Sequence, residues 1–201
     1  MRCNLLQIGS HIGNTVNDNV FNVIDSDYFA IFVEPIKEYF DSLVENYNQT
    51  YPNNNFVFIN KACSNETKKI KLYKPIHKNG LPNWTNQLTS ILPNHAKNHN
   101  IDTQVEEIEV EAIKVSDIIN EYNISEIDLL SVDTEGHDYE IIKSIDFELI
   151  KPKKIIFEHK HMEGTNKSFG PRYFDLINYL NSKGYIVIKQ EGDDTFMTLN
   201  K

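Results

Sequence analysis

The fold of this chain is recognised most clearly from one segment, Ile127-Asp-Leu-Leu-Ser-Val-Asp-Thr-Glu-Gly-His-Asp-Tyr-Glu140. Its first six residues form a short, nearly continuous apolar run, which is typical of a parallel strand covered on both faces. Acids, a glycine and a histidine then follow where the next helix should begin. Ligands of open α/β sheets bind outside the carboxyl ends of the strands. We therefore expect a parallel α/β sheet with a functional site at the end of this strand.

The ionisable side chains after this strand have a structural explanation as well as a functional one. Asp133 or Thr134 would cap the following helix, and the other acids would favour its positive N-terminal end. That explanation accounts for one or two residues but not for the whole cluster. The cluster consists of Asp133, Glu135, His137 and Asp138. We therefore treat it as a candidate site.

The composition is that of an ordinary globular protein. The chain has 201 residues, 40 % of them apolar and 24 % charged, and is expected to form a single domain over 1–201. A net charge of −9 argues against nucleic-acid binding, which needs basic surface. No segment is typical of a signal peptide or membrane span, so we expect a cytoplasmic protein without a membrane partner. Cys3 and Cys63 make no metal-binding spacing and are expected to be small buried hydrophobes.

Strands and helices alternate along most of the chain, which indicates a parallel sheet with helices on both faces. Strands are expected at 3–8, 29–33, 56–59, 127–132 and 154–157, with a C-terminal hairpin at 185–188 and 196–199. Helices are expected from Pro35 to about 47, near 116–122 and from Pro171 to Gly184. A further helix is expected after Gly13, with one face formed by Val16, Val20, Val23 and Ile24. Another is expected after His137, with a buried face formed by Ile141, Ile142, Ile145 and Leu149.

The alternation stops in a long irregular insertion at about 61–114. Residues 69–73 and 107–113 have the period of strands, and between them lies a polar loop around Trp84. Long loops inside compact domains are commonly functional or mobile, so we expect the insertion to form part of a ligand pocket. Trp84 would lie near the ligands or would anchor the loop to the core. The histidines of the insertion, His77, His95 and His99, show no ligand spacing.

Two features near the N-terminus favour a nucleotide-like ligand. Gly9-Ser-His-Ile-Gly13 follows the first strand, and its glycines allow a tight turn and close approach of a ligand. His11 stands where a dinucleotide fingerprint would have its middle glycine. Glu34 ends the second strand about 20 residues farther on, where an acid can bind the two hydroxyls of a ribose. The alternatives are a ligand-free turn and an exposed acid before a helix.

Four segments carry a family resemblance: Gln7-Ile-Gly-Ser-His-Ile-Gly-Asn14, Val33-Glu-Pro35, Ile127 through Glu140, and Ile155-Ile-Phe-Glu158. Together they resemble the FkbM-type family of S-adenosylmethionine-dependent O-methyltransferases, from about Leu5 to Leu199. The resemblance implies a doubly wound, Rossmann-like methyltransferase sandwich with a mostly parallel seven-stranded sheet and one antiparallel strand. It also implies an enzyme that methylates a hydroxyl of a sugar or another small metabolite.

We expect the cofactor, S-adenosylmethionine, to be bound by Gln7, Gly9, Ser10, Gly13, Glu34 and Asp133. His137 is the first candidate for the base that removes the hydroxyl proton, with Asp133 as its orienter or as a substrate ligand. His159 is the second candidate. The family usually has an acid at the position of Gln7 and a small or amide-bearing residue at that of His11.

A metal ion is compatible with the residue types but is not favoured. Asp133 with Glu158, His159 or His161 offers ligands for a divalent ion, yet the spacing is not a metal motif. We therefore expect a site without metal.

Two other classes of protein stay open. A non-catalytic binding or scaffold protein with this fold fits Gln7, and a nicotinamide-dependent oxidoreductase fits the first strand and Glu34. The expected partner is a small-molecule acceptor rather than nucleic acid, and a homo-oligomer is also open. A basic patch formed by Lys68, Lys69, Lys71 and Lys74 would argue for nucleic acid instead.

Overall fold

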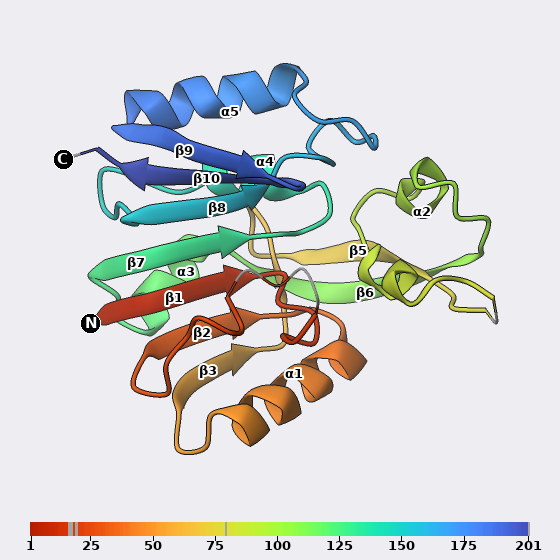
Figure 1. Cartoon of the computed structure of the whole chain (residues 1–201), viewed down its shortest axis with the longest axis horizontal. Helices are drawn as coiled ribbons and strands as arrows, with labels where there is room; N and C mark the ends of the chain where they lie inside the picture. The colour runs from red at the N-terminus through yellow and green to blue at the C-terminus, as the bar shows by residue number, and fades with distance from the viewer. Residues whose placement is uncertain (16–17, 19, 79, 201) are drawn as a thin grey trace.

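The computed structural model describes residues 1–15, 18, 20–78 and 80–200. Its main sheet has seven strands in the order β3-β2-β1-β7-β8-β10-β9 (Figure 1). In sheet order they are Asn55–Ile59, Phe29–Val33, Arg2–Ile8, Glu126–Val132, Lys154–Glu158, Asp194–Leu199 and Tyr185–Glu191. Neighbouring strands are parallel except that β10 is antiparallel to both β8 and β9. The predicted α/β fold with one antiparallel strand is confirmed.

Helices cover both faces of this sheet. The helices that pack on it are α1 (Lys37–Thr50), α3 (Val115–Glu121), α4 (Asp138–Lys143) and α5 (Pro171–Ser182), and the short helix α2 (His95–Asn98) lies apart from them (Figure 1). Leu6 of the central strand β1 points into a core that also contains buried residues of α3, α4 and α5. Leu5 points to the opposite face, where Leu43 and Tyr47 of α1 pack. Both faces of β1 are therefore buried, as its apolar run predicts.

The helix predicted after Gly13 is wrong for the described part of the chain. The described residues between 14 and 28 form turns, and Val16 lies outside the described residues. Val20 is buried against the sheet, whereas Val23 is 68 % exposed. Oδ1 of Asp18 accepts the backbone N–H groups of Val20 and Phe21. Because an aspartate that binds nearby backbone groups competes with helix formation, this segment covers the sheet with turns instead.

Two helix boundaries also differ from the prediction. The helix after His137 ends at Lys143, so Leu149 lies beyond it and is 84 % exposed. Pro35 was expected in the first turn of its helix, but α1 begins at Lys37. Side-chain spacing alone does not show where a helix stops, because a turn can continue the same burial period for a few residues.

The insertion folds into a second, smaller sheet. Its strands are β4 (Ala62–Cys63), β5 (Lys69–Pro75) and β6 (Val105–Ile113), in the order β4-β6-β5. The 3₁₀ helix η1 (Asn83–Gln87) and α2 lie between β5 and β6 in the chain. Figure 1 shows the small sheet beyond the carboxyl ends of β1 and β7. The strand patterns predicted within the insertion are confirmed, and they lie at the edge of the main sheet where ligands bind in this class of fold.

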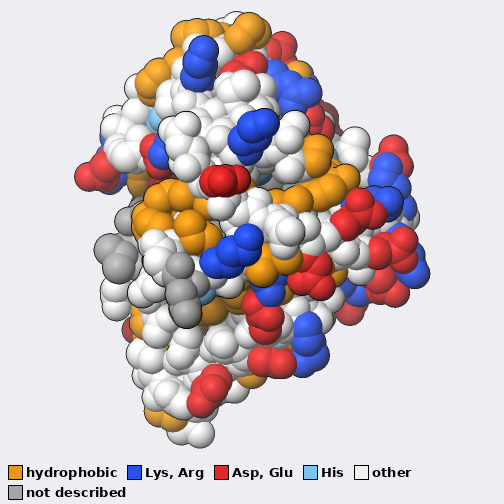
Figure 2. Space-filling model, turned by 90° about the vertical axis from the view of Figure 1, so that its right-hand side faces the viewer, with side chains coloured by type: hydrophobic (Ala, Val, Ile, Leu, Met, Phe, Trp, Pro, Cys, Tyr) orange, Lys and Arg blue, Asp and Glu red, His pale blue; other side chains and the backbone are white. Residues whose placement is uncertain are grey.

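The four lysines of the suspected basic patch all have acidic partners. Nζ of Lys69 lies 2.8 Å from Glu109, and Nζ of Lys71 lies 2.6 Å from Glu107 on the neighbouring strand. The remaining pairs are Lys68 with Glu66 and Lys74 with Glu38. Figure 2 shows basic and acidic side chains next to one another on this side of the molecule. Among the described residues, no helix combines the length and the hydrophobicity of a membrane span.

Candidate active site

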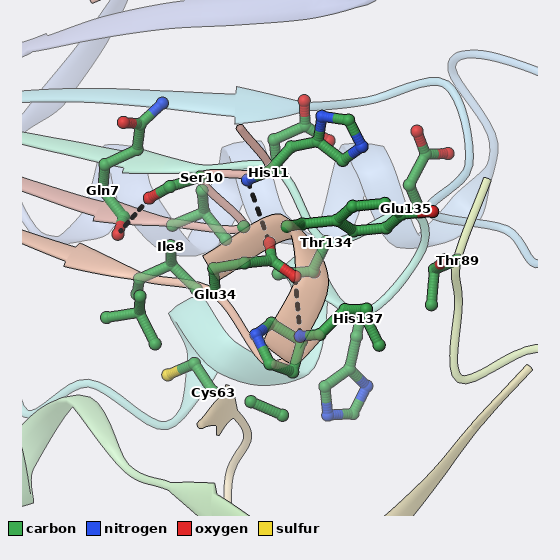
Figure 3. A pocket seen from close by; sticks show the side chains of 18 of the residues that line it. Gln7, Ile8, Ser10, His11, Glu34, Cys63, Thr89, Thr134, Glu135 and His137 are labelled. Atoms are coloured by element: carbon green, nitrogen blue, oxygen red, sulfur yellow. Dashed lines mark hydrogen bonds between the residues drawn. The ribbon is translucent and has the colours of Figure 1, made fainter. Parts of the chain in front are cut away.

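One cavity lies where the carboxyl ends of β1, β2 and β7 meet the insertion (Figure 3). It measures about 1110 Å³, including the part open to solvent, which is large enough for a cofactor-sized ligand. Its apolar wall contains Ile36, Tyr39, Cys63, Ile70, Leu72 and Ile91, and its acidic side chains are Asp18, Glu34, Asp133, Glu135 and Asp194. The insertion therefore forms part of this cavity, through residues of β4, β5 and the loop at 87–91.

The glycine turn after β1 is shaped by packing. Gly9 has a φ of +79°, and a Cβ atom there would lie 1.6 Å from the carbonyl oxygen of Asp133. Ser10 is buried beside it and donates a hydrogen bond from Oγ to the carbonyl of Gln7 (3.3 Å). Gly13 faces away, because a Cβ atom there would meet the ring of Tyr47 at 2.6 Å. Gly9 and Ser10 line the cavity, whereas Gly13 does not.

His11 lines the cavity, although sequence reasoning treated it only as a missing glycine. Its φ of 47° is the left-handed conformation for which a glycine would be favoured. Its ring lies 4.3 Å from that of Tyr39, and both ring nitrogens are buried without a hydrogen-bond partner. Burial lowers the pKa of His11 to about 4, so the imidazole is neutral at neutral pH. Because His11 lies between Gly9 and Gly13 in the expected ligand loop, the sequence could have indicated that its side chain lines the site.

Asp18 supplies a carboxylate beside Gln7. Nε2 of Gln7 donates a hydrogen bond to Oδ2 of Asp18 (2.9 Å). Oε1 of Gln7 is buried without a partner, and both side chains line the cavity. Burial raises the pKa of Asp18. Sequence reasoning missed Asp18, since nothing in the spacing of the two residues indicates that they meet.

Glu34 ends β2 with both carboxylate oxygens bound to the backbone. Oε2 accepts the N–H of His11 (2.9 Å) and Oε1 accepts that of Ile36 (2.8 Å), as Figure 3 shows. The residue is only 5 % exposed, and burial raises its pKa to about 7. Each carboxylate oxygen can accept a further hydrogen bond, and Glu34 lines the cavity. The structure therefore brings Glu34 and the glycine turn together, as the sequence predicts.

His137 also lines the cavity, but its contacts differ from those expected. Nε2 lies 3.1 Å from Oγ of Ser64, and Nδ1 lies 3.6 Å from Oε2 of Glu140. These neighbours, rather than Asp133, hold the ring among the described residues. Burial lowers the pKa of His137, which keeps the imidazole neutral at neutral pH. The predicted role of Asp133 as orienter of His137 is therefore not supported.

The turn after β7 is fixed by Asp138, which is fully buried. Its Oδ2 accepts hydrogen bonds from the backbone N–H (3.1 Å) and from Oγ1 (2.7 Å) of Thr134. Neither Asp133 nor Thr134 caps the helix, because His137 occupies that position without a capping hydrogen bond. Asp133 is thus left facing the cavity, which favours the functional explanation of this residue over the structural one.

His159 does not reach the cavity. It is buried with Nδ1 3.0 Å from Oγ1 of Thr195, and its ring stacks on Phe169 at 4.6 Å. Successive side chains at a strand end point to opposite sides, so His159 points away from the side of its neighbour Glu158. The prediction of His159 as a second candidate base is not supported by this position.

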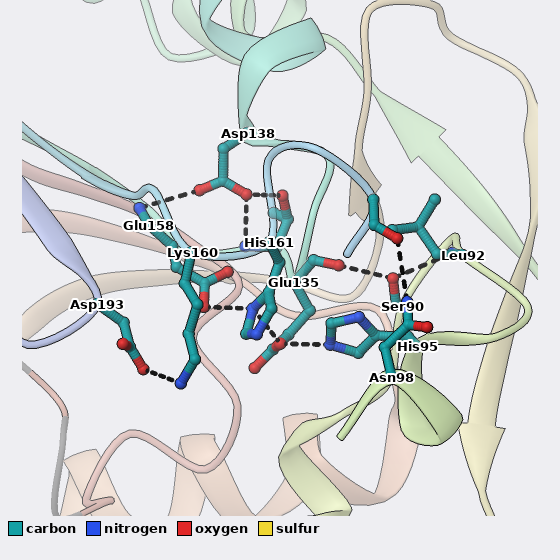
Figure 4. A network of polar contacts seen from close by, with 12 residues as sticks. Ser90, Leu92, His95, Asn98, Glu135, Asp138, Glu158, Lys160, His161 and Asp193 are labelled. Carbon is teal, nitrogen blue, oxygen red and sulfur yellow. Dashed lines mark hydrogen bonds and ion pairs between the residues drawn. The ribbon is translucent and has the colours of Figure 1, made fainter. Parts of the chain in front are cut away.

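A second polar cluster adjoins the cavity at Glu135 (Figure 4). Its Oε2 lies 2.7 Å from Nε2 of His95 and 3.0 Å from Nδ1 of His161. His99 lies beside both rings, and burial, together with these two histidines, lowers its pKa to about 4. His95 begins α2 and His99 directly follows its last residue, so these two histidines, four residues apart, lie with their rings 4.9 Å from each other.

The strand order and the cavity at the carboxyl edge define a Rossmann-like methyltransferase fold. Residues 7–187 match the methyltransferase FkbM domain, and the chain belongs to this family of methyltransferases.

Two solved structures are similar to this chain at low sequence identity. A chain of the fibrillarin/Nop5p complex is 14 % identical with a TM-score of 0.46, over all of this chain and 72 % of the other. Precorrin-6y C5,15-methyltransferase from Geobacter metallireducens GS-15 is 9 % identical with a TM-score of 0.44, over 98 % of this chain and 80 % of the other. Comparison with curated proteins gives no match.

Proposed function

We propose that the protein is an S-adenosylmethionine-dependent O-methyltransferase that acts on a hydroxyl of a sugar or another small metabolite. One observation carries the proposal: the turn at Gly9, the carboxylate of Glu34 and the segment from Asp133 to His137 line one cavity. These three segments lie far apart in the sequence and were each expected at a cofactor site. Membership of a methyltransferase family supports the same reaction type.

The residues of the cavity fit a nucleoside joined to a charged amino acid. Glu34 has acceptor positions for two ribose hydroxyls, and Ile36 and Leu72 offer apolar surface for a base. The unpartnered Oε1 of Gln7 and the carboxylate of Asp18 suit an ammonium group. When bound, S-adenosylmethionine supplies a methyl group already activated on a positively charged sulfur.

The chain itself would align the acceptor, remove its proton and exclude water. Acidic side chains such as Asp133 favour positive charge in the cavity. The neutral imidazole of His137 accepts the hydroxyl proton at Nε2, the nitrogen that now contacts Ser64. Gln87 and Ile91 of the insertion line the cavity and would help to limit the access of water to a bound acceptor.

A nicotinamide-dependent oxidoreductase is less compatible with this geometry. Such enzymes bind the pyrophosphate at the N-terminus of a helix that follows the glycine turn. The described residues between 14 and 28 contain no such helix. The side chain of His11 also occupies the place of the glycine that lets the pyrophosphate approach.

Calorimetry with S-adenosylmethionine, S-adenosylhomocysteine and NAD separates the three classes of protein. Binding of the first two without NAD is expected for the methyltransferase. Binding of NAD alone would identify an oxidoreductase, and failure of all three to bind would favour a scaffold protein.

Replacing Glu34 with glutamine is expected to weaken the binding of S-adenosylmethionine by about one to two orders of magnitude. Hydrogen bonds to a charged group contribute about 1.5–3 kcal/mol, and the variant loses the charge. Calorimetry measures the effect, with Glu45→Gln on the exposed side of α1 as the control. Equal affinity in wild type and E34Q would refute the assignment of Glu34 to the ribose.

The same variant should change how stability depends on pH. Burial raises the pKa of Glu34 from its usual 4.5 to about 7. Between pH 4.5 and pH 7, Glu34 is largely deprotonated in the unfolded chain but still protonated in the folded one. The free energy of unfolding of the wild type therefore falls as pH rises through this range. The shift corresponds to about 3 kcal/mol. Burial also raises the pKa of Asp138 to about 7. Asp138 therefore lowers the free energy of unfolding with rising pH in the wild type and in E34Q alike, and its effect cancels in the difference between them.

Denaturant titrations at about pH 4.5 and about pH 8 measure this effect. The stability of E34Q relative to wild type should rise by about 3 kcal/mol between the two conditions. A difference that does not change with pH would contradict the burial of an ionisable Glu34.

A further inference from the structure

The cluster around Glu135 joins three parts of the fold that are distant in sequence. His95 begins α2 of the insertion and His99 follows the last residue of this helix, Glu135 follows β7, and His161 follows β8. A ring nitrogen of each histidine and a carboxylate oxygen of Glu135 all lie within 4.8 Å of one another. Imidazole nitrogens with one carboxylate oxygen are ligands that zinc and similar ions prefer.

The arrangement of the rings matches a common central ion. The three ring centroids are 4.9 Å (His95 to His99), 4.6 Å (His95 to His161) and 4.6 Å (His99 to His161) apart. A tetrahedral ion with bonds of about 2.1 Å holds its ligand atoms about 3.4 Å apart, which places imidazole rings about 5 Å from one another. The observed spacing is therefore close to that of three histidines on one ion.

The hydrogen bonding of the cluster is incomplete without such an ion. Nε2 of His99 and Nε2 of His161 are buried and have no hydrogen-bond partner. His161 is only 3 % exposed, so water does not readily satisfy its ring. Unpaired buried nitrogens are uncommon in folded proteins, and an ion bound among these rings would give both nitrogens a partner.

The surrounding charges also favour a cation. Carboxylate oxygens of Asp133, Glu135 and Glu158 lie within 4.8 Å of one another. Lys160 approaches this region but pairs with Asp193 at 2.6 Å (Figure 4). Oε1 of Glu158 lies 2.5 Å from Nδ1 of His161, and such a carboxylate commonly orients a metal-binding imidazole.

We propose that His95, His99, Glu135 and His161 bind a divalent transition-metal ion of the zinc type. The ion fastens the insertion to the carboxyl ends of β7 and β8. Because Glu135 also lines the cavity, the same ion fixes one wall of the candidate active site. The proposal goes beyond methyl transfer and does not depend on it.

Metal titration of the full chain, after treatment with a chelator, tests the site directly. We expect one Zn²⁺ or Co²⁺ per chain with a dissociation constant below about 1 µM, and little binding of Mg²⁺, which prefers oxygen ligands. Co²⁺ should show the visible absorption of a four-coordinate ion with nitrogen ligands. Trp84, the only tryptophan, has its ring 6.1 Å from that of His99, so bound Co²⁺ should quench its fluorescence.

Variants identify the ligands. His99→Ala and His161→Ala should each weaken Zn²⁺ binding by at least about 100-fold, since loss of an outer-shell partner alone costs about 10–100-fold. His77→Ala, an exposed histidine of the same insertion, should bind as the wild type does. Excess Zn²⁺, at about 100 times the dissociation constant, should raise the melting temperature of the wild type by about 5–10 °C.

Three results would overturn the proposal: no stoichiometric Zn²⁺ or Co²⁺ in the wild type, tight binding that survives in folded His99→Ala and His161→Ala proteins, or preference for Mg²⁺ over Zn²⁺. If the two variants fail to fold, the wild-type stoichiometry, Co²⁺ absorption and Trp84 quenching decide the question. Calorimetry with S-adenosylmethionine is a separate measurement, so failure of the metal site and failure of the proposed methyl transfer are distinguishable.

Discussion

Replacing His137 with alanine is expected to lower the rate of methyl transfer by about 10²–10⁴-fold while cofactor affinity stays largely intact. The ring lines the cavity at the start of α4, and burial lowers its pKa, so it can accept a proton at neutral pH. Single-turnover rates and calorimetry on the same variant measure the two quantities separately.

Two other histidine variants serve as comparisons. His159→Ala should lose stability and retain the rate, because its ring packs on Phe169 away from the cavity. His11→Ala changes the other imidazole that lines the cavity. If His137 only begins the helix, its loss should cost about 1 kcal/mol of stability and spare the rate. A normal rate in His137→Ala with a reduced rate in His11→Ala would move the base to His11.

Replacing Gly9 with alanine is expected to prevent stable folding, with a loss of more than about 4 kcal/mol. The added Cβ atom would lie 1.6 Å from the carbonyl oxygen and 2.7 Å from the carbonyl carbon of Asp133. Both are backbone atoms of Asp133, the residue after β7, and the N–H of Asp133 donates a hydrogen bond to the carbonyl of Ile8 at the end of the parallel strand β1 (2.9 Å). Neither strand can move without breaking this pairing. Soluble yield and denaturant titration measure the effect.

Gly192→Ala is the matched control for backbone strain. Gly192 has a φ of +60° in the turn between β9 and β10, and a Cβ atom there would meet no atom within 4 Å. It should therefore cost only the strain of a left-handed residue, roughly 1–2 kcal/mol. Similar losses in the two variants would show that the conformation of Gly9, rather than its contact with Asp133, is what matters.

The fold was largely predictable because its strands are short apolar runs with sharp ends. The predicted strand at 29–33 coincides with β2, and the predicted C-terminal hairpin is formed by β9 and β10. The helix predicted after Gly13 failed for a local reason: the side chain of Asp18 binds the backbone N–H groups that a helix would use. Apolar spacing cannot reveal such competition.

The candidate site was predictable only in part. Glu34 and His137 were found because they stand directly after strands, and parallel strand ends meet at one edge of a sheet. Gly13 and His159 were expected there as well, but the structure turns both away from the cavity. Which way a side chain points at a strand end depends on the register of the last residue, which the sequence does not define within one position.

By itself, the sequence determined the type of sheet, the edge at which ligands bind and several segments that meet there. Burial on both faces follows from apolar patterning, and a parallel sheet follows from the alternation of strands and helices. Only the tertiary structure decided that Asp18 meets Gln7 and that His95 and His99 meet Glu135 and His161. These contacts join residues from different loops. Their distances follow from how the insertion packs on the main sheet, a property of the folded chain as a whole that no local spacing encodes.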